Sequence, residues 1–179
     1  MRKETKTTVK IGMLAAVGVI LMYLEIPILP PPFSFLKLDF SEVPVLIGGF
    51  ALGPLAAVAI EIVKNLVHFF IKNDGTGGLG NLANVVVGCA LAVPATWYYL
   101  KHKTRKSVLI ALAIGTVSMV VVGVLANYFI FLPLYGIVEH GAKIAFITGG
   151  IIPINLIKAV ATGLVTFLLY KPLSPVLHR

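Results

Sequence analysis

The chain has 179 residues, of which 58% are hydrophobic and only 12% are charged, and its mean hydropathy is +0.97. A soluble domain carries about twice that share of charged residues, so the composition argues against a water-soluble enzyme and, despite a formal net charge of +8, against a nucleic-acid-binding protein. The single cysteine, Cys89, excludes an intramolecular disulfide and a cysteine-rich metal site. The composition predicts an all-α protein that crosses a membrane several times.

Apolar segments follow one another along the chain, and a helix that crosses a bilayer needs roughly 20 such residues. The first segment is too long for a cleaved signal peptide and lacks a small-residue cleavage pattern, so we expect a retained helix. The second is short and ends at Gly53-Pro54, because proline cannot continue a helix and glycine permits a tight turn. The Gly-rich sequence at 73–78 ends the third. A single integral-membrane domain over 1–179 is therefore predicted, with six transmembrane helices at about 9–29, 43–52, 55–71, 79–100, 108–132 and 147–170.

Basic residues fall unevenly on the two sides of this predicted bundle. Six crossings place both termini on one side, together with the connection between the fourth and fifth helices. Ten basic residues share that side: Arg2, Lys3, Lys6, Lys10, Lys101, Lys103, Arg105, Lys106, Lys171 and Arg179. Only Lys37, Lys72 and Lys143 lie on the other side. Since cytoplasmic segments of membrane proteins are enriched in Lys and Arg, both termini are predicted to be cytoplasmic.

Polar residues within the predicted spans are candidates for a binding site. Asn155 and Lys158 are three residues apart and share one face of the sixth helix. Asn127 lies near the outward end of the fifth helix, and Asn84 lies one turn inside the fourth. An ammonium group inside a span is costly and usually faces a cavity or the bundle interior. The amides of Asn127 and Asn155 and the ammonium of Lys158 suit a neutral polar ligand; the alternative is that the amides join helices while Lys158 extends outward to the interface.

A second polar stripe follows the third helix at Glu61, Lys64, Asn65 and His68. Glu61 precedes Lys64 by three residues and can pair with it. A buried structural network is as well supported by this spacing as contact with a ligand. Proton transfer through His68 is less favoured, because the sequence places no second histidine or carboxylate close by in a span.

Two outward connections are unusually aromatic. Residues 33–41 include Phe33, Phe35 and Phe40, and residues 131–136 include Tyr135. Such residues pack either at the bilayer interface or at the mouth of a pocket. Because both connections adjoin polar helix ends, we expect them to form a lid over an outward-facing pocket. Ser41 or Asp39 is expected to be the N-cap of the second helix, and this structural role is the one favoured for Asp39.

Motifs for independent chemistry are absent from the sequence. It has no P-loop, no His-Glu-x-x-His motif, no cysteine pair and no Gly-x-Ser-x-Gly motif. The two carboxylates expected within spans, Glu25 and Glu61, fall on different helices. Two matching halves with broken helices, which many self-sufficient transporters show, are also missing. We therefore predict no enzyme activity and no metal site, and we interpret the chain as one part of a larger machine.

Several segments together resemble a known family. These are Phe-Ser-Phe-Leu-Lys-Leu-Asp-Phe-Ser-Glu-Val-Pro, Gly-Gly-Phe-Ala-Leu-Gly-Pro, Val-Lys-Asn-Leu-Val-His, Asn-Tyr-Phe-Ile-Phe-Leu-Pro-Leu-Tyr-Gly and Pro-Ile-Asn-Leu-Ile-Lys. Over nearly its whole length the chain resembles the substrate-binding S components of energy-coupling factor (ECF) transporters. The fourth and fifth segments point to the riboflavin-specific subfamily.

The resemblance implies a six-helix S-component fold in a prokaryotic plasma membrane and high-affinity capture of riboflavin, which is the transported ligand rather than a cofactor. It assigns flavin contacts to Asn127, Asn155 and Lys158. We add Asn84 as a further polar contact, and Phe40 and Tyr135 as aromatic residues able to cover the flavin ring.

Partner subunits are also implied by the resemblance. They are a transmembrane coupling subunit (EcfT), which docks on helix one through Gly12, Ala15 and Ala16, and two cytoplasmic ATPases. One alternative is an S component for another vitamin, such as pantothenate, folate or thiamine. A second alternative is a standalone carrier or membrane enzyme that uses Glu61 and His68.

Overall fold

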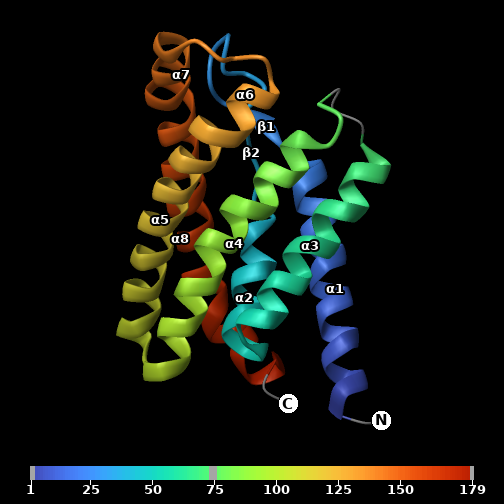
Figure 1. Cartoon of the computed structure of the whole chain (residues 1–179). Coiled ribbons are helices and arrows are strands. Elements are labelled where there is room, and N and C mark those ends of the chain that lie inside the picture. Colours follow the sequence, from blue (N-terminus) through green and yellow to red (C-terminus); the bar gives the residue numbers. More distant parts are fainter. Residues whose placement is uncertain (1–2, 73–75, 178–179) are drawn as a thin grey trace.

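The computed structural model describes residues 3–72 and 76–177, which form a tall helical bundle (Figure 1). In chain order the elements are α1 (Lys3–Tyr23), β1 (Ile26–Pro27), β2 (Lys37–Leu38), α2 (Glu42–Leu52), α3 (Pro54–Ile71), α4 (Leu79–His102), α5 (Arg105–Ala126), η1 (Asn127–Phe131), α6 (Leu132–Leu134), α7 (His140–Phe146), η2 (Ile147–Ile151) and α8 (Ile152–Leu177), where η marks a π-helical turn. Five residues named in the sequence predictions lie outside the described residues: Arg2, Asn73, Asp74, Gly75 and Arg179. The side chains of Lys3 and Lys171 do so as well.

The helices of the described residues run back and forth between the two ends of the bundle (Figure 1), and they comprise five long apolar stretches and one shorter apolar helix. Five helical stretches within the described residues are long and apolar enough to cross a membrane. The sixth passage is different, because α2 has only 11 residues and is therefore about 17 Å long. The segment that contains β2 occupies the upper half of this passage and α2 the lower half (Figure 1). The second predicted helix is thus part of a crossing that begins as extended chain.

Helix α1 ends at Tyr23, six residues before the predicted end at residue 29. The chain then enters β1, which pairs antiparallel with β2, so that Ile26 lies opposite Leu38 and Pro27 opposite Lys37. Proline disfavours helix both at its own position and at the preceding one, and this stops the helix although the sequence stays apolar. Glu25, which was expected inside a span, therefore lies beyond the helix.

The last two passages are longer than predicted and contain π-helical turns. The stretches Arg105–Leu134 and His140–Tyr170 each qualify as one continuous candidate span. Pro133 lies two residues after η1 and Pro153 two residues after η2. A proline ring clashes with the carbonyl group four residues earlier, which in both cases belongs to the π-helical turn. The wider turn therefore lets each helix continue past its proline.

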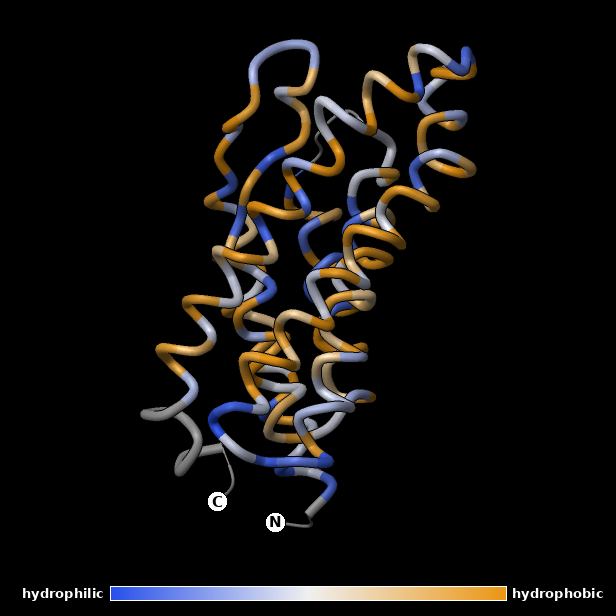
Figure 2. The backbone as a smooth tube through the Cα atoms, turned by 90° about the vertical axis from the view of Figure 1, so that its left-hand side faces the viewer, coloured by the Kyte–Doolittle hydropathy of each residue, from blue (hydrophilic) through white to orange (hydrophobic). Residues whose placement is uncertain are grey.

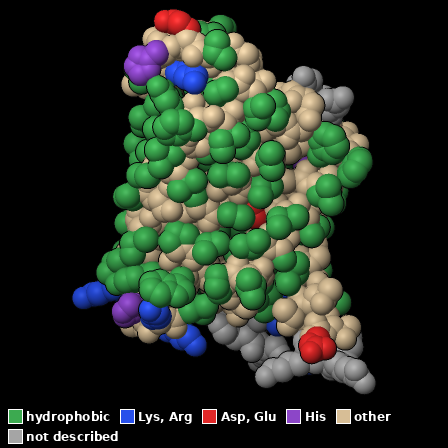
Figure 3. Space-filling view, in the orientation of Figure 1, with side chains coloured by type: hydrophobic (Ala, Val, Ile, Leu, Met, Phe, Trp, Pro, Cys, Tyr) green, Lys and Arg blue, Asp and Glu red, His purple; other side chains and the backbone are tan. Residues whose placement is uncertain are grey.

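The surface of the bundle agrees with a membrane environment. In the backbone view, hydrophobic residues predominate along the helices between the two ends (Figure 2). In the space-filling view, charged side chains gather mainly at the ends and the band between them is largely hydrophobic (Figure 3). Both termini lie at one end, with the α4–α5 connection (Figure 1). Their common end fits the predicted even number of crossings, and the cytoplasmic assignment of that end stays a prediction.

Small residues let α4 and α5 approach closely. A Cβ atom added at Gly115 would lie 2.5 Å from the carbonyl oxygen of Leu91 and 3.1 Å from the Cβ of Ala95. Both neighbours belong to the buried core, and the nearest atom is backbone. Any side chain at position 115 therefore forces the two helices apart.

Gly115→Ala is expected to lower the free energy of unfolding by about 1–3 kcal/mol, the usual cost of overpacking, although alanine favours helix by about 1 kcal/mol. Gly12→Ala serves as the control, because a Cβ atom there meets nothing within 4 Å. Thermal unfolding of both variants in detergent measures the difference. Equal stability of the two variants would contradict the close packing of α4 against α5.

Candidate functional site

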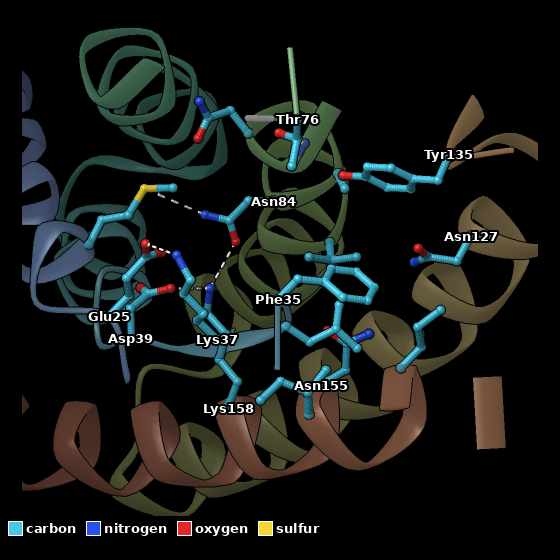
Figure 4. Close-up of a pocket in the computed structure, with 18 of the residues that line it drawn as sticks. Glu25, Phe35, Lys37, Asp39, Thr76, Asn84, Asn127, Tyr135, Asn155 and Lys158 are labelled. Carbon is cyan, nitrogen blue, oxygen red and sulfur yellow. Dashed lines mark hydrogen bonds and ion pairs between the residues drawn. The ribbon is translucent and has the colours of Figure 1, made fainter. Parts of the chain in front are cut away.

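A cavity lies between helix ends (Figure 4), at the end of the bundle opposite the two termini (Figure 1). Its lining combines residues from α1, the β-strand connection, α3, α4, η1, α6, η2 and α8. The polar lining residues are Glu25, Lys37, Asp39, His68, Thr76, Asn81, Asn84, Asn127, Tyr135, Asn155 and Lys158. The apolar ones are Met22, Phe35, Leu36, Gly80, Ala83, Val87, Leu132, Ile151 and Ile154. The walls therefore combine apolar residues with about an equal number of residues that can form hydrogen bonds.

Five of the six predicted contact residues line this one cavity: Asn84, Asn127, Tyr135, Asn155 and Lys158. They come from α4, from the passage that continues α5 through η1 and α6, and from α8 (Figure 4). The sixth, Phe40, is not among the lining residues, and Phe35 from the same aromatic connection takes that place. Phe40 directly precedes the first turn of α2, where its carbonyl oxygen accepts a hydrogen bond from the Val43 N–H at 3.0 Å. The sequence identified the aromatic segment but not which of its rings faces the cavity.

The ammonium group of Lys158 has partners that sequence reasoning did not find. It donates to Asp39 Oδ2 at 2.9 Å and to Asn84 Oδ1 at 2.8 Å, and Glu42 Oε1 lies 3.4 Å away. Asp39 also accepts the Ser41 N–H at 2.8 Å through Oδ1. Asp39 therefore has two roles. It accepts the N–H group of Ser41, which is the N-cap residue of α2 in place of Asp39, and it neutralises a lysine from α8.

The two remaining predicted amides are less occupied. Asn127 donates through Nδ2 to the Gly123 carbonyl at 2.8 Å, and its side-chain oxygen has no donor among the described residues. Asn155 is 7% exposed and lines the cavity, and its side chain makes no hydrogen bond within residues 3–72 and 76–177. Its amide atoms are not among the fully buried polar atoms that lack a partner, so they are accessible from the cavity. An accessible, unpaired amide can both donate to and accept from a molecule in the cavity.

The mouth of the cavity is held by one carboxylate and by aromatic contacts. Glu25 Oε1 lies 2.5 Å from Lys37 Nζ and 2.8 Å from Lys72 Nζ, so it joins the α1 end, β2 and the α3 end. The Phe35 ring lies 6.1 Å from the Tyr135 ring. The two aromatic connections thus pack against each other beside the cavity, as expected for a lid.

The polar stripe of α3 lies deeper in the bundle. Lys64 Nζ pairs with Glu61 Oε2 at 2.9 Å, which confirms the predicted pair, and with Glu42 Oε1 at 2.7 Å, which the sequence did not reveal. Asn65 contacts Glu61. Of these stripe residues only His68 lines the cavity. The stripe is therefore mainly a buried network between helices.

Two comparisons of sequence place the chain among membrane transport proteins. The family model described as "ECF transporter, substrate-specific component" matches residues 6–170. The riboflavin transporter RibU of Staphylococcus aureus is 36% identical, over 99% of this chain and 95% of that protein. The riboflavin transporter FmnP of Bacillus subtilis is 30% identical, over 96% of this chain and 94% of that protein.

Solved structures agree on the fold. A structure described as the S component of a bacterial ECF transporter aligns with a TM-score of 0.83 at 35% identity, covering 99% of this chain and 100% of the other. ThiT from Listeria monocytogenes aligns with a TM-score of 0.63 at 18% identity, over 99% of both chains. The second likeness concerns the fold alone.

Proposed function

Since this chain belongs to the family of substrate-specific (S) components of ECF transporters, we propose that its outward cavity binds riboflavin and that the chain is the binding subunit of a vitamin uptake transporter. It is a multi-pass protein of a prokaryotic plasma membrane. The observation that carries the proposal is the unpaired amide of Asn155 on the cavity wall, between Asn127 and Lys158. Hydrolysis of ATP belongs to partner subunits.

The chemistry of riboflavin suits this lining. Its ring system is flat and largely apolar, and the side chains of Phe35, Leu132 and Ile151 supply apolar surface for the ring faces. The pyrimidine edge of the ring alternates hydrogen-bond donors and acceptors. The amide of Asn155 offers both kinds of group, and Asn127 keeps an acceptor. An ammonium group has three N–H donors. Lys158 donates two of them to Asp39 and Asn84, which leaves the third for a ligand acceptor.

The charge balance of the cavity favours a neutral ligand over the two carboxylate-bearing alternatives, pantothenate and folate. Lys158 already has Asp39 at 2.9 Å and Glu42 at 3.4 Å as counter-charges. A carboxylate-bearing ligand such as pantothenate or folate would enter beside these two acidic groups and be repelled by them. Riboflavin is uncharged at neutral pH, so it is not repelled by Asp39 and Glu42 and leaves their pairing with Lys158 intact.

Riboflavin binding is expected to be tight, one-to-one and accompanied by quenching of flavin fluorescence in detergent. Asn155→Ala should weaken binding by about 1–3 kcal/mol for each hydrogen bond that is lost. Leu156→Ala is the matched control, because the neighbouring side chain is 47% exposed on the outside of the bundle. Absence of quenching by the unmodified protein at micromolar concentration would overturn the proposed ligand. Equal affinity of the Asn155→Ala and Leu156→Ala variants would move the site elsewhere.

A shallow groove on α1 and α3 is the proposed contact with the coupling subunit EcfT, which in turn joins two cytoplasmic ATPases. The groove is lined by Gly12, Ala15, Ala16, Val19, Ile20, Val63 and Val67. Small residues let a second helix approach closely within a membrane. The predicted docking residues of helix one thus share one surface, although Ala15 itself is only 1% exposed.

Ala16→Trp is expected to fill the groove and to reduce co-purification with the coupling subunit at least tenfold, while riboflavin still binds. Met13→Trp is the control, since Met13 is 65% exposed on the same helix and is not among the residues that line the groove. Co-expression of each variant with the coupling subunit and the ATPases, followed by affinity capture, measures assembly. Equal capture of the two variants would contradict this docking surface.

A further inference from the structure

Six side chains form a closed ring of hydrogen bonds and ion pairs that connects the cavity wall to the centre of the bundle: Lys158, Asn84, Asn65, Glu61, Lys64 and Glu42. Lys158 Nζ donates to Asn84 Oδ1 at 2.8 Å, and Asn84 Nδ2 donates to Asn65 Oδ1 at 3.2 Å. Asn65 Nδ2 donates to Glu61 Oε1 at 2.7 Å. The remaining links are the ion pairs Glu61–Lys64 at 2.9 Å, Lys64–Glu42 at 2.7 Å and Glu42–Lys158 at 3.4 Å.

The orientation of each amide in this ring is determined by its neighbour. Asn65 Nδ2 also donates to the backbone carbonyl of Glu61 at 2.9 Å. A carbonyl oxygen can only accept, so the NH₂ group of Asn65 must face Glu61 and its oxygen must face Asn84. Asn84 must then present its own NH₂ group to Asn65. The oxygen of Asn84 is left to face Lys158.

This orientation decides what the cavity wall offers. If Asn84 were turned over, its NH₂ group would face the ammonium of Lys158, and two donors would oppose each other. Lys158 would lose one of its two short hydrogen bonds and leave its present position. With Asn84 as observed, two N–H groups of Lys158 are held by Asn84 and Asp39. The third is left for Glu42, at 3.4 Å, or for a ligand acceptor.

We propose that Asn65, which does not line the cavity, is a positioning residue for ligand recognition that acts through Asn84 on Lys158. Asn65 is 2% exposed and Glu61 is fully buried, so neither touches the ligand. The inference rests on the proposed riboflavin function, because it assigns the donor of Lys158 to that ligand. Asn65 and Glu61, two of the three ring residues that belong to α3, thereby have a role in ligand binding in addition to their role in the core.

A double-mutant cycle tests whether Asn65 acts through Asn84. The full-length chain in detergent is titrated with riboflavin, and quenching is measured for N65L, N84A and N65L/N84A. N65L is expected to weaken binding at least tenfold in the unmodified background and less than twofold in the N84A background. The fold-changes in affinity caused by two independent substitutions multiply, whereas the fold-changes caused by substitutions in one coupled unit do not. A tenfold loss in both backgrounds would mean that Asn65 affects binding only by general damage, and would overturn the proposal.

A second variant guards against misfolding of N65L. In N65D, a carboxyl group that shares a proton with Glu61 keeps one donor toward Glu61 and one acceptor toward Asn84. N65D should therefore bind riboflavin within threefold of the unmodified chain. A loss above tenfold at unchanged thermal stability would overturn the proposal.

Thr96→Val is the matched control on α4, because Thr96 Oγ1 is buried without a hydrogen-bond partner in the described part of the chain and lies outside the ring. Its riboflavin affinity should equal that of the unmodified chain. If the unmodified chain itself does not bind riboflavin, the proposed function fails. If it binds while N65L binds equally well, only the present inference fails.

Discussion

Lys158→Met is expected to abolish riboflavin binding at micromolar concentration and to lower the free energy of unfolding by about 3–5 kcal/mol. Methionine keeps most of the length of the lysine side chain but removes the ammonium group. Asp39, which is 5% exposed, then becomes a buried carboxylate without its 2.9 Å partner. Removing one member of a buried ion pair costs this much because the other charge remains in a poorly solvated site.

Two further variants separate binding from stability. Lys158→Met combined with Asp39→Asn removes both charges and should recover most of the stability, but it should not recover binding. Lys37→Met is the control for stability only, because Lys37 itself lines the cavity; its side chain is 28% exposed and its partner Glu25 keeps a second lysine, Lys72. Exposed pairs contribute about 0–1 kcal/mol. Denaturant unfolding and riboflavin titration of the same samples measure both effects, and micromolar binding by Lys158→Met would show that Lys158 does not contact the ligand.

The general architecture could be predicted from the sequence because the cost of burying polar groups in lipid is large. Apolar length located the helices, and the rarity of amides and lysines within spans pointed to Asn127, Asn155 and Lys158, which line one cavity. These inferences need only local composition and helical spacing. They do not depend on how the helices pack against one another.

The partners of the buried charges could not be predicted in the same way. Asp39 and Lys158 are 119 residues apart in sequence, and Lys64 and its partner Glu42 are 22 residues apart. Spacing rules apply within one helix, so they revealed the Glu61–Lys64 pair and missed both of these. The same limit hid the role of Asn65, because its contact with Asn84 joins α3 to α4.

Local backbone details were also out of reach. The predicted first helix ran to residue 29 because hydropathy does not distinguish an apolar strand from an apolar helix, whereas the chain forms β1 at Ile26–Pro27. Phe40 and Phe35 have the same chemistry, and only the path of the segment before α2 decides that Phe35 lines the cavity. Side-chain direction in an irregular segment has no period from which it can be predicted.

Lys64→Met is expected to destabilise the protein at least as much as Lys158→Met, by about 3–5 kcal/mol or more. Lys64 is fully buried and lies 2.7 Å from Glu42 and 2.9 Å from Glu61. It also donates to Ser41 Oγ at 2.8 Å, so its removal leaves two carboxyl groups and a hydroxyl without this donor. Lys158, at 3.4 Å from Glu42, compensates only in part.

Adding Glu61→Gln to Lys64→Met should restore part of the lost stability, because it removes one of the two carboxylates that are left unpaired. The unfolding free energy in denaturant, measured against Lys37→Met, tests this order. A loss below about 1 kcal/mol for Lys64→Met would mean that the ring behaves like an exposed ion pair. A large loss with partial recovery would show that the charges at the centre of the bundle depend on one another. Such dependence is expected if Glu61 fixes the orientation of the Asn65 amide, which fixes that of Asn84 next to Lys158.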